Sequence, residues 1–159
     1  MANVGKLFEK DFQDSFNKYE EESRYSLDRF HDGVGGYAVK NICDYMLYKW
    51  PNQYYFELKS YGTHLINFSA ISPTQYDGLL EKSTITGVRA GVLFNYNDYN
   101  ESYFIKIDRI RVMKDRGFKS IPVETARIYG ALLPIKRQRK VTVDYDIEKF
   151  IWNVSKLYE

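Results

Sequence analysis

Two acidic residues and a lysine lie on neighbouring segments that have the composition of β-strands. Asp44 falls in residues 41–49, and Glu57 and Lys59 fall in residues 53–60; together these segments are rich in Tyr, Phe and Ile. If the Trp-Pro-Asn sequence between them forms a turn centred on the Trp-Pro bond, Asp44 stands directly opposite Glu57. Directly opposed residues point to the same face, with Cβ atoms ~4.5–5.5 Å apart. Lys59 lies two residues beyond Glu57 and projects to that face as well.

This arrangement of charges suits divalent metal chemistry on a phosphate. Two carboxylates directly opposite each other destabilise a sheet unless something binds between them. Mg²⁺ takes oxygen ligands, often one or two carboxylates together with water and a substrate phosphate. Such an ion activates water and neutralises phosphoryl charge, and Lys59 would orient the water or stabilise the transition state. The alternative is that Lys59 only neutralises Glu57 or Asp44 on an exposed sheet face.

The remaining composition excludes several other classes of protein and site. The chain has 159 residues, of which 44% are hydrophobic and 28% charged, as expected for one globular domain over residues 1–159. The single cysteine, Cys43, excludes a disulfide framework and a multi-cysteine zinc site. No apolar run is long enough for a membrane helix or a signal peptide, so we expect a cytoplasmic protein. His31 and His64 show no paired spacing.

The elements that must position the acidic residues follow from hydrophobic periodicity. Residues 30–37 are glycine-rich and break the first helix, but their GVGG sequence alone is too weak to indicate a phosphate-binding loop. Ser72 and Asp146 are expected to be helix N-caps. The order of elements predicts an α/β fold with a central mixed β-sheet flanked by helices. The predicted helices are 4–24, 73–82, 122–130 and 147–157, and the predicted strands are 41–49, 53–60, 88–96 and 102–108.

Positive charge is concentrated locally, because the net charge is only +2. Residues 136–140 contain four cations and no acid, and residues 106–119 contain six cations opposed by two acids. Basic clusters near aromatic residues are typical of a phosphate-binding surface, and the alternative is a solvated basic face. The residues expected to contact DNA are Lys136, Arg137, Arg139, Lys140, Arg109 and Arg111.

The chain resembles the RecU-type Holliday junction resolvases of the PD-(D/E)xK nuclease superfamily. The resemblance begins at GKLFEKDF in the first helix and includes Asp44 and the FELK sequence that contains Glu57 and Lys59. It continues through ISPTQYDGL, GVLFNY, YFIKID and KSIPVE. Two features depart from the family: Ser72 stands where the family pattern has His, and the segment before Asp44 has no room for a protruding stalk. A short, bacteriophage-like member is indicated.

The resemblance implies a restriction-endonuclease-like fold and a Mg²⁺-dependent endonuclease, with Mn²⁺ as a substitute. The expected substrate is branched DNA, in particular the four-way junction of recombination and repair, cut to leave a 5′-phosphate and a 3′-hydroxyl. The expected metal ligands are Asp44, Glu57 and Glu9. Lys59 would activate water and Gln75 would orient water or phosphate. A homodimer is expected, because a twofold enzyme matches the symmetry of two cuts; no small-molecule substrate is expected.

Two alternatives remain open from the sequence. One is another PD-(D/E)xK nuclease that acts on flap, nicked or duplex DNA. The other is a non-catalytic DNA-binding module that keeps the fold. The joint presence of Asp44, Glu57 and Lys59 favours an enzyme.

Overall fold

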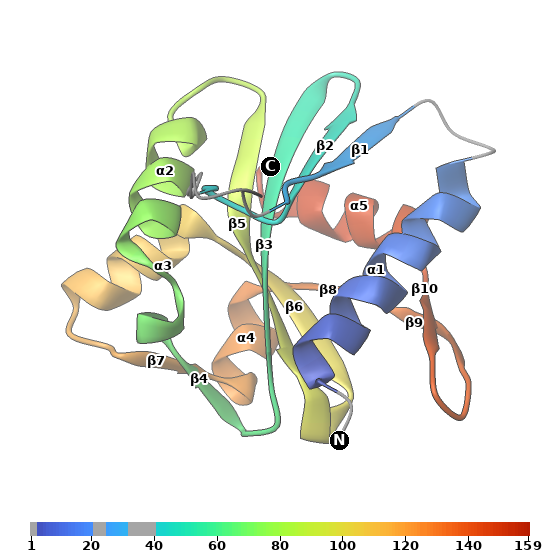
Figure 1. Cartoon of the computed structure of the whole chain (residues 1–159). Coiled ribbons are helices and arrows are strands. Elements are labelled where there is room, and N and C mark those ends of the chain that lie inside the picture. Colours follow the sequence, from blue (N-terminus) through green and yellow to red (C-terminus); the bar gives the residue numbers. More distant parts are fainter. Residues whose placement is uncertain (1–2, 21–24, 32–40) are drawn as a thin grey trace, which may run out of the picture.

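A six-stranded mixed sheet forms the centre of the molecule in the computed structural model (Figure 1), which describes residues 3–20, 25–31 and 41–159. The strand order is β1-β2-β3-β5-β6-β8; β3 and β5 are parallel, and every other neighbouring pair is antiparallel. The predicted mixed sheet with flanking helices is confirmed. Its strands are β1 (Ser26–Arg29), β2 (Tyr45–Lys49), β3 (Asn52–Tyr61), β5 (Val88–Tyr96), β6 (Glu101–Lys106) and β8 (Ala131–Leu132).

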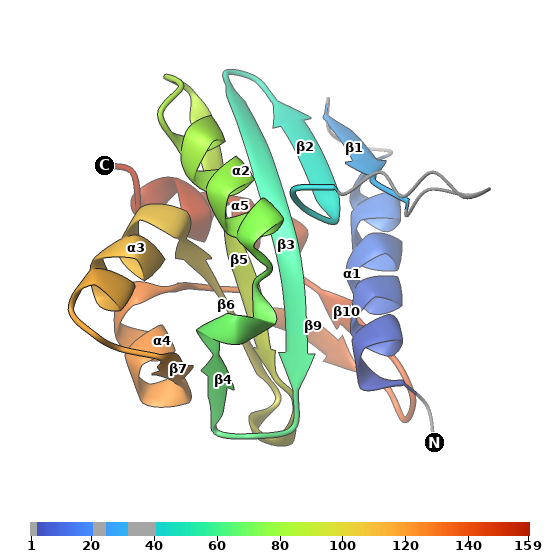
Figure 2. The same ribbon diagram turned by 60° about the vertical axis from the view of Figure 1, so that its left-hand side comes forward.

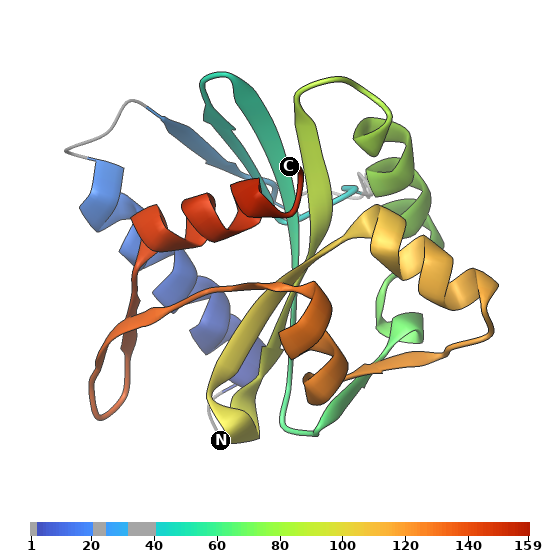
Figure 3. The ribbon, with the colours of Figure 1, turned by 180° about the vertical axis from the view of Figure 1, so that it is seen from behind.

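Helices cover both faces of the sheet, and each face has its own hydrophobic core. Figure 2 shows the first helix on one side of the sheet and the second and third helices on the other. Seen from behind in Figure 3, the last helix crosses the same face as the first. The helices are α1 (Val4–Glu20), α2 (Pro73–Ser83), α3 (Ile107–Asp115), α4 (Val123–Tyr129) and α5 (Ile147–Lys156), with 3-10 turns η1 (Phe68–Ala70) and η2 (Asn97–Tyr99).

The first core is dominated by aromatic rings. Phe12 and Phe16 of α1 and Phe150 of α5 are completely buried, and Phe12 contacts Phe56 of β3 with ring centroids 6.1 Å apart. The second core mixes aliphatic and aromatic side chains and packs Leu79 of α2 and parts of α3 and α4 against the opposite face of β5 and β6. Burial of such side chains contributes about 1.5–3 kcal/mol each, so the sheet is a rigid platform for groups at its edge.

The register predicted for the acidic hairpin is confirmed from Tyr45 to Lys49. In β2 and β3, Tyr45 pairs with Phe56 and Lys49 pairs with Asn52, and the connecting Trp50-Pro51 peptide bond is cis. The regular pairing ends at Tyr45, because the Asp44 amide donates to the Phe56 carbonyl at 3.1 Å, one residue out of register with the ladder. The predicted pairing of Asp44 directly opposite Glu57 is therefore not part of the observed ladder.

Several elements differ from the sequence prediction. The predicted strand 102–108 ends at Lys106, where α3 begins, since Ile107, Ile110 and Met113 recur at helical spacing and are buried. The strand β1 was not predicted. Residues 21–24 of the predicted first helix and most of the glycine-rich segment 30–37 lie outside the described residues. Two small antiparallel sheets were also not predicted: β4 (Leu65–Asn67) with β7 (Ser120–Pro122), and β9 (Ile135–Gln138) with β10 (Val143–Tyr145).

Candidate metal and nuclease site

Backbone hydrogen bonding fixes the first carboxylate of the site. Asp44 immediately precedes β2, and its Oδ2 accepts a hydrogen bond from the Leu58 amide at 2.8 Å. This bond draws the Asp44 side chain over β3, close enough to Glu57 for the two carboxyl groups to interact. We call Asp44 and Glu57 the carboxyl pair.

Glu57 is buried and has one satisfied and one unsatisfied oxygen. Only 2% of the residue is exposed. Its Oε1 is 2.8 Å from Lys59 Nζ and accepts a hydrogen bond of 2.8 Å from Gln75 Nε2. Its Oε2 accepts no hydrogen bond from any residue that the structure describes. A buried, ionised oxygen without a partner is costly and indicates a missing proton or cation.

The start of α2 explains why Gln75 reaches Glu57. Ser72 is the N-cap and forms a capping box with Gln75: the Gln75 amide donates to Ser72 Oγ at 3.2 Å, and the Ser72 amide donates to Gln75 Oε1 at 3.0 Å. With its oxygen held by the cap, the Gln75 side chain presents its NH₂ group to Glu57. The predicted cap at Ser72 is confirmed, and the structure brings Gln75 to the carboxyl pair.

Burial raises the pKa of both acids of the carboxyl pair. Burial, reinforced by the charge of Asp44, raises the pKa of Glu57 from 4.5 to about 7, although Lys59 opposes the shift. Burial also raises the pKa of Asp44, while the hydrogen bond from Leu58 and the charge of Lys59 lower it in part. Glu57 is thus partly protonated near neutral pH, and a divalent cation bound to it would displace that proton.

The raised pKa predicts a pH-dependent effect of Glu57→Gln on stability. Between about pH 4.5 and pH 7 the folded protein binds more protons than the unfolded chain, so ionising Glu57 destabilises the fold as pH rises. We expect Glu57→Gln to raise the free energy of unfolding by about 1–2 kcal/mol near pH 8 with chelator present, and to change it little near pH 5. Urea denaturation of both proteins at the two pH values measures this.

Glu148→Gln serves as the control, because Glu148 is an exposed acid on α5. Glu148 lies in the first turn of α5, so its substitution should lower the free energy of unfolding slightly and by about the same amount at both pH values. A Glu57→Gln protein that is less stable than the parent near pH 8 would contradict the assignment.

The carboxyl pair has the donor set for a hard divalent cation. After the hydrogen bonds to Glu57 Oε1 and Asp44 Oδ2, Glu57 Oε2 has no partner among the described residues, and the two carboxyl groups are close enough to share a proton or a cation. Two carboxylate oxygens, with water and a phosphate oxygen, form a typical Mg²⁺ ligand set. No group of three or more His, Cys, Asp or Glu side chains is placed to hold a metal within the described residues.

The structure places Glu9 apart from the carboxyl pair. Glu9 Oε2 accepts a hydrogen bond of 2.8 Å from Arg29 on β1, and the Tyr45 hydroxyl donates to the Glu9 carbonyl at 3.5 Å. The positive charge of Arg29 also lowers the pKa of Asp44, against the larger effect of burial. Arg29 thus acts electrostatically on Glu9 and on Asp44. The role of Glu9 at a metal stays a prediction.

Arg29 was missed because β1 is short, polar and mostly exposed. The sequence signal for this strand was the alternation of polar and apolar residues in SLDR, but four residues are too few to establish a strand pattern.

Cys43, which precedes Asp44, is 2% exposed. Burial, followed by the charges of Glu57 and Asp44, raises the pKa of its thiol to about 12, so the thiol is protonated. Its side chain packs in the core between the sheet and helices α2 and α3.

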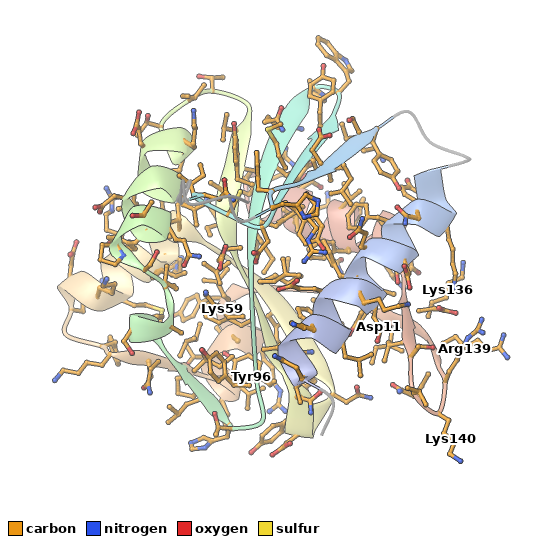
Figure 4. The ribbon with its side chains drawn as sticks, in the orientation of Figure 1. Asp11, Lys59, Tyr96, Lys136, Arg139 and Lys140 are labelled. Carbon is orange, nitrogen blue, oxygen red and sulfur yellow. The ribbon has the colours of Figure 1, made fainter. Side chains whose placement is uncertain are left out.

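The first predicted DNA-contacting cluster lies on the β9–β10 hairpin. Lys136, Arg137, Arg139 and Lys140 are all exposed. The hairpin is anchored to α1, because the Val143 amide donates to Asp11 Oδ2 at 3.1 Å. Figure 4 shows the labelled hairpin cations on the far side of α1 from Lys59, so they lie away from the carboxyl pair.

The hairpin cluster is less free than its sequence indicates. Asp144 of β10 lies 3.2 Å from Arg139 and 2.6 Å from Lys18 of α1. The expectation that the cluster is unopposed is therefore wrong for Arg139. It failed because Asp144 follows the cluster by four residues and is brought back by the antiparallel turn.

The second predicted cluster lies on α3. Arg109 stacks over the Tyr129 ring at 4.4 Å, and Arg111 is 3.9 Å from Asp108. Both arginines are exposed, and whether they contact DNA stays a prediction.

Comparison with known proteins gives a match at the level of structure. No family model matches the sequence, and no curated protein matches it either. The fold is similar to that of Hjc, a Holliday junction resolvase from the archaeal hyperthermophile Archaeoglobus fulgidus. The TM-score is 0.51 at 15% sequence identity, over 76% of this chain and 92% of the Hjc chain. This similarity confirms the predicted restriction-endonuclease-like fold. Among the described helices, none combines the length and apolarity needed to cross a bilayer.

Proposed function

We propose that this protein is a divalent-metal-dependent endonuclease that hydrolyses phosphodiester bonds in branched DNA, with the four-way junction as its substrate. The observation that carries the proposal is the convergence of Asp44, Glu57 and Lys59 at one place, with Glu57 buried and one of its oxygens unsatisfied. The similarity in fold to a Holliday junction resolvase supports the choice of substrate class.

Each residue of the site has a distinct role in this proposal. Asp44 and Glu57 hold Mg²⁺, or Mn²⁺ in its place, and Glu9 assists once Arg29 releases it. Gln75 is a positioning residue, because it occupies Glu57 Oε1 and leaves Oε2 for the metal. Lys59 is the catalytic cation, and 17% of its side chain is exposed, so the ammonium group can reach a bound phosphate.

The chemistry follows from where charge develops. When bound, the metal supplies Lewis acidity and charge neutralisation at the scissile phosphate. Lys59 donates hydrogen bonds to the attacking water and to a non-bridging phosphate oxygen, where negative charge grows in the transition state. The backbone bond from Leu58 and the amide of Gln75 hold the carboxyl pair in place beforehand, so little reorganisation is needed at the moment of reaction.

A four-way junction requires two cuts related by a twofold axis. We propose that the protein acts as a homodimer whose two sites face one DNA surface, because twofold symmetry then matches that of the substrate. The resemblance of the sequence to the RecU-type resolvases supports this assembly.

The proposal is tested by incubating the protein with a synthetic four-way junction, a flap, a nicked duplex and a plain duplex, with Mg²⁺ or with EDTA. We expect paired symmetric cuts in the junction with Mg²⁺ and none with EDTA. Equal cleavage of flap or duplex would show a nuclease of different preference. Binding without cleavage in either Mg²⁺ or Mn²⁺ would contradict the enzymatic function.

A further inference from the structure

A groove lies beside the start of α2, outside the carboxyl pair. It has a volume of about 710 Å³, within the range of ligand-binding pockets. None of the nine described residues that line it is acidic. Its floor and walls are largely apolar and its rim carries two lysines. The residues that line it include Phe68, Ile71, Pro73, Lys114, Phe118 and Lys119.

Phe118 is an exposed aromatic ring on a rigid support. Its side chain is 57% exposed. It follows α3 in a Schellman motif: the Phe118 amide donates to the Met113 carbonyl at 3.0 Å, and the Gly117 amide donates to the Lys114 carbonyl at 2.9 Å. Gly117 has φ +89°, the left-handed conformation that this motif requires. The turn therefore holds Phe118 at the surface.

The two lysines give the groove a positive rim. Lys114 lies with Nζ 3.9 Å from the centre of the Tyr76 ring on α2, which holds the ammonium group between α3 and α2. The backbone of Lys119 is fixed to the groove floor, because its carbonyl accepts a hydrogen bond of 2.9 Å from the Phe68 amide. Both lysines are exposed, and neither forms an ion pair within the described part of the chain.

The groove is close to the carboxyl pair along the chain and in space. Pro73 lines the groove and is the first residue of α2, while Gln75, two residues later, donates to Glu57. In Figure 1, η1, the start of α2 and the turn after α3 lie on the same side of the sheet. The first turn of α2 therefore connects the groove with the carboxyl pair.

We propose that the groove binds an unpaired nucleotide of single-stranded DNA, with its base stacked on Phe118 and its flanking phosphates on Lys114 and Lys119. Exposed aromatic rings between cations are how proteins grip single strands without reading sequence. A base in duplex DNA is stacked within the helix and cannot reach the ring. The inference rests on the proposed nuclease function only for the identity of the nucleic acid.

The test is binding of a short fluorescent oligothymidylate, followed by anisotropy in EDTA so that no cleavage occurs. Stacking on an aromatic ring contributes about 1–3 kcal/mol per base, so we expect Phe118→Ala to weaken binding about tenfold. Phe118→Trp should retain or improve the affinity. Replacing Lys114 and Lys119 together with Gln should lower the slope of log affinity against log salt by about 1–1.5.

Trp152→Ala is the matched control, because Trp152 is 59% exposed on α5 and does not line the groove. It should leave binding unchanged. Oligothymidylate binding that is insensitive to Phe118→Ala, or a salt slope unchanged in the double lysine variant, would overturn the proposal. Affinity lost in Phe118→Ala but restored in Phe118→Trp would support it. If the protein cuts no DNA but its oligothymidylate binding depends on Phe118, the nuclease function is refuted and the proposal that the groove binds single-stranded DNA is still supported.

Discussion

Asp44→Asn and Glu57→Gln should each slow cleavage of a four-way junction at least about a thousandfold in Mg²⁺, equivalent to about 4 kcal/mol of transition-state stabilisation. Each substitution removes one of the two carboxylates that hold the metal and leaves the side chain nearly unchanged in size. DNA affinity should stay within about threefold of the parent, since phosphate contacts elsewhere position the duplex arms. Single-turnover rates at saturating enzyme measure the first effect, and gel shift in Ca²⁺ measures the second.

Glu124→Gln is the control for this pair, because Glu124 is an exposed acid on α4, remote in sequence from both carboxylates. It should cleave at the parent rate. Cleavage at the parent rate by either Asp44→Asn or Glu57→Gln would remove the carboxyl pair from the reaction.

Replacing Lys136, Arg137, Arg139 and Lys140 together with Gln should have the largest effect on affinity. Each phosphate contact contributes about 0.9 to the slope of log affinity against log salt. Arg139 is already paired with Asp144, so we expect the slope to fall by about 2–3 rather than by the full four contacts. The cleavage rate at saturating DNA should change little, because the hairpin lies across α1 from Lys59.

Replacing Arg109 and Arg111 of α3 with Gln gives a second variant, whose salt slope is compared with that of the hairpin variant. Both arginines are engaged by neighbouring side chains, and we expect their loss to lower the slope by less than about 1. If the hairpin variant keeps the parent slope and the α3 variant does not, the DNA-binding surface lies on α3.

The carboxyl pair was predictable because strand pairing is a local rule. A tight turn at Trp50-Pro51 fixes which residues face each other, and the observed register from Lys49 to Tyr45 follows directly. Gln75 was placed at the site by resemblance alone. The capping box between Ser72 and Gln75 is a local motif, but the approach of Gln75 to Glu57 depends on the packing of α2 against β5, which no local pattern reports.

The missed features share a physical cause, which is that long-range contacts decide them. The β9–β10 strands are short and exposed, and they are held by α1 through Asp11 and Ser15, residues far away in sequence. The boundary between β6 and α3 was missed because the apolar alternation of a strand passes directly into the helical spacing of Ile107 and Ile110. Arg29 was hidden in an edge strand of four residues.

The central claim is that Asp44 and Glu57 together hold a divalent cation. The most direct measurement is electron paramagnetic resonance of Mn²⁺ titrated into the metal-free protein near pH 8 without DNA, in which bound Mn²⁺ is lost from the free-ion signal. We predict one saturable site in the parent and in Glu124→Gln, weakened at least about tenfold in Asp44→Asn and in Glu57→Gln. Equal Mn²⁺ binding by all four proteins would contradict the account.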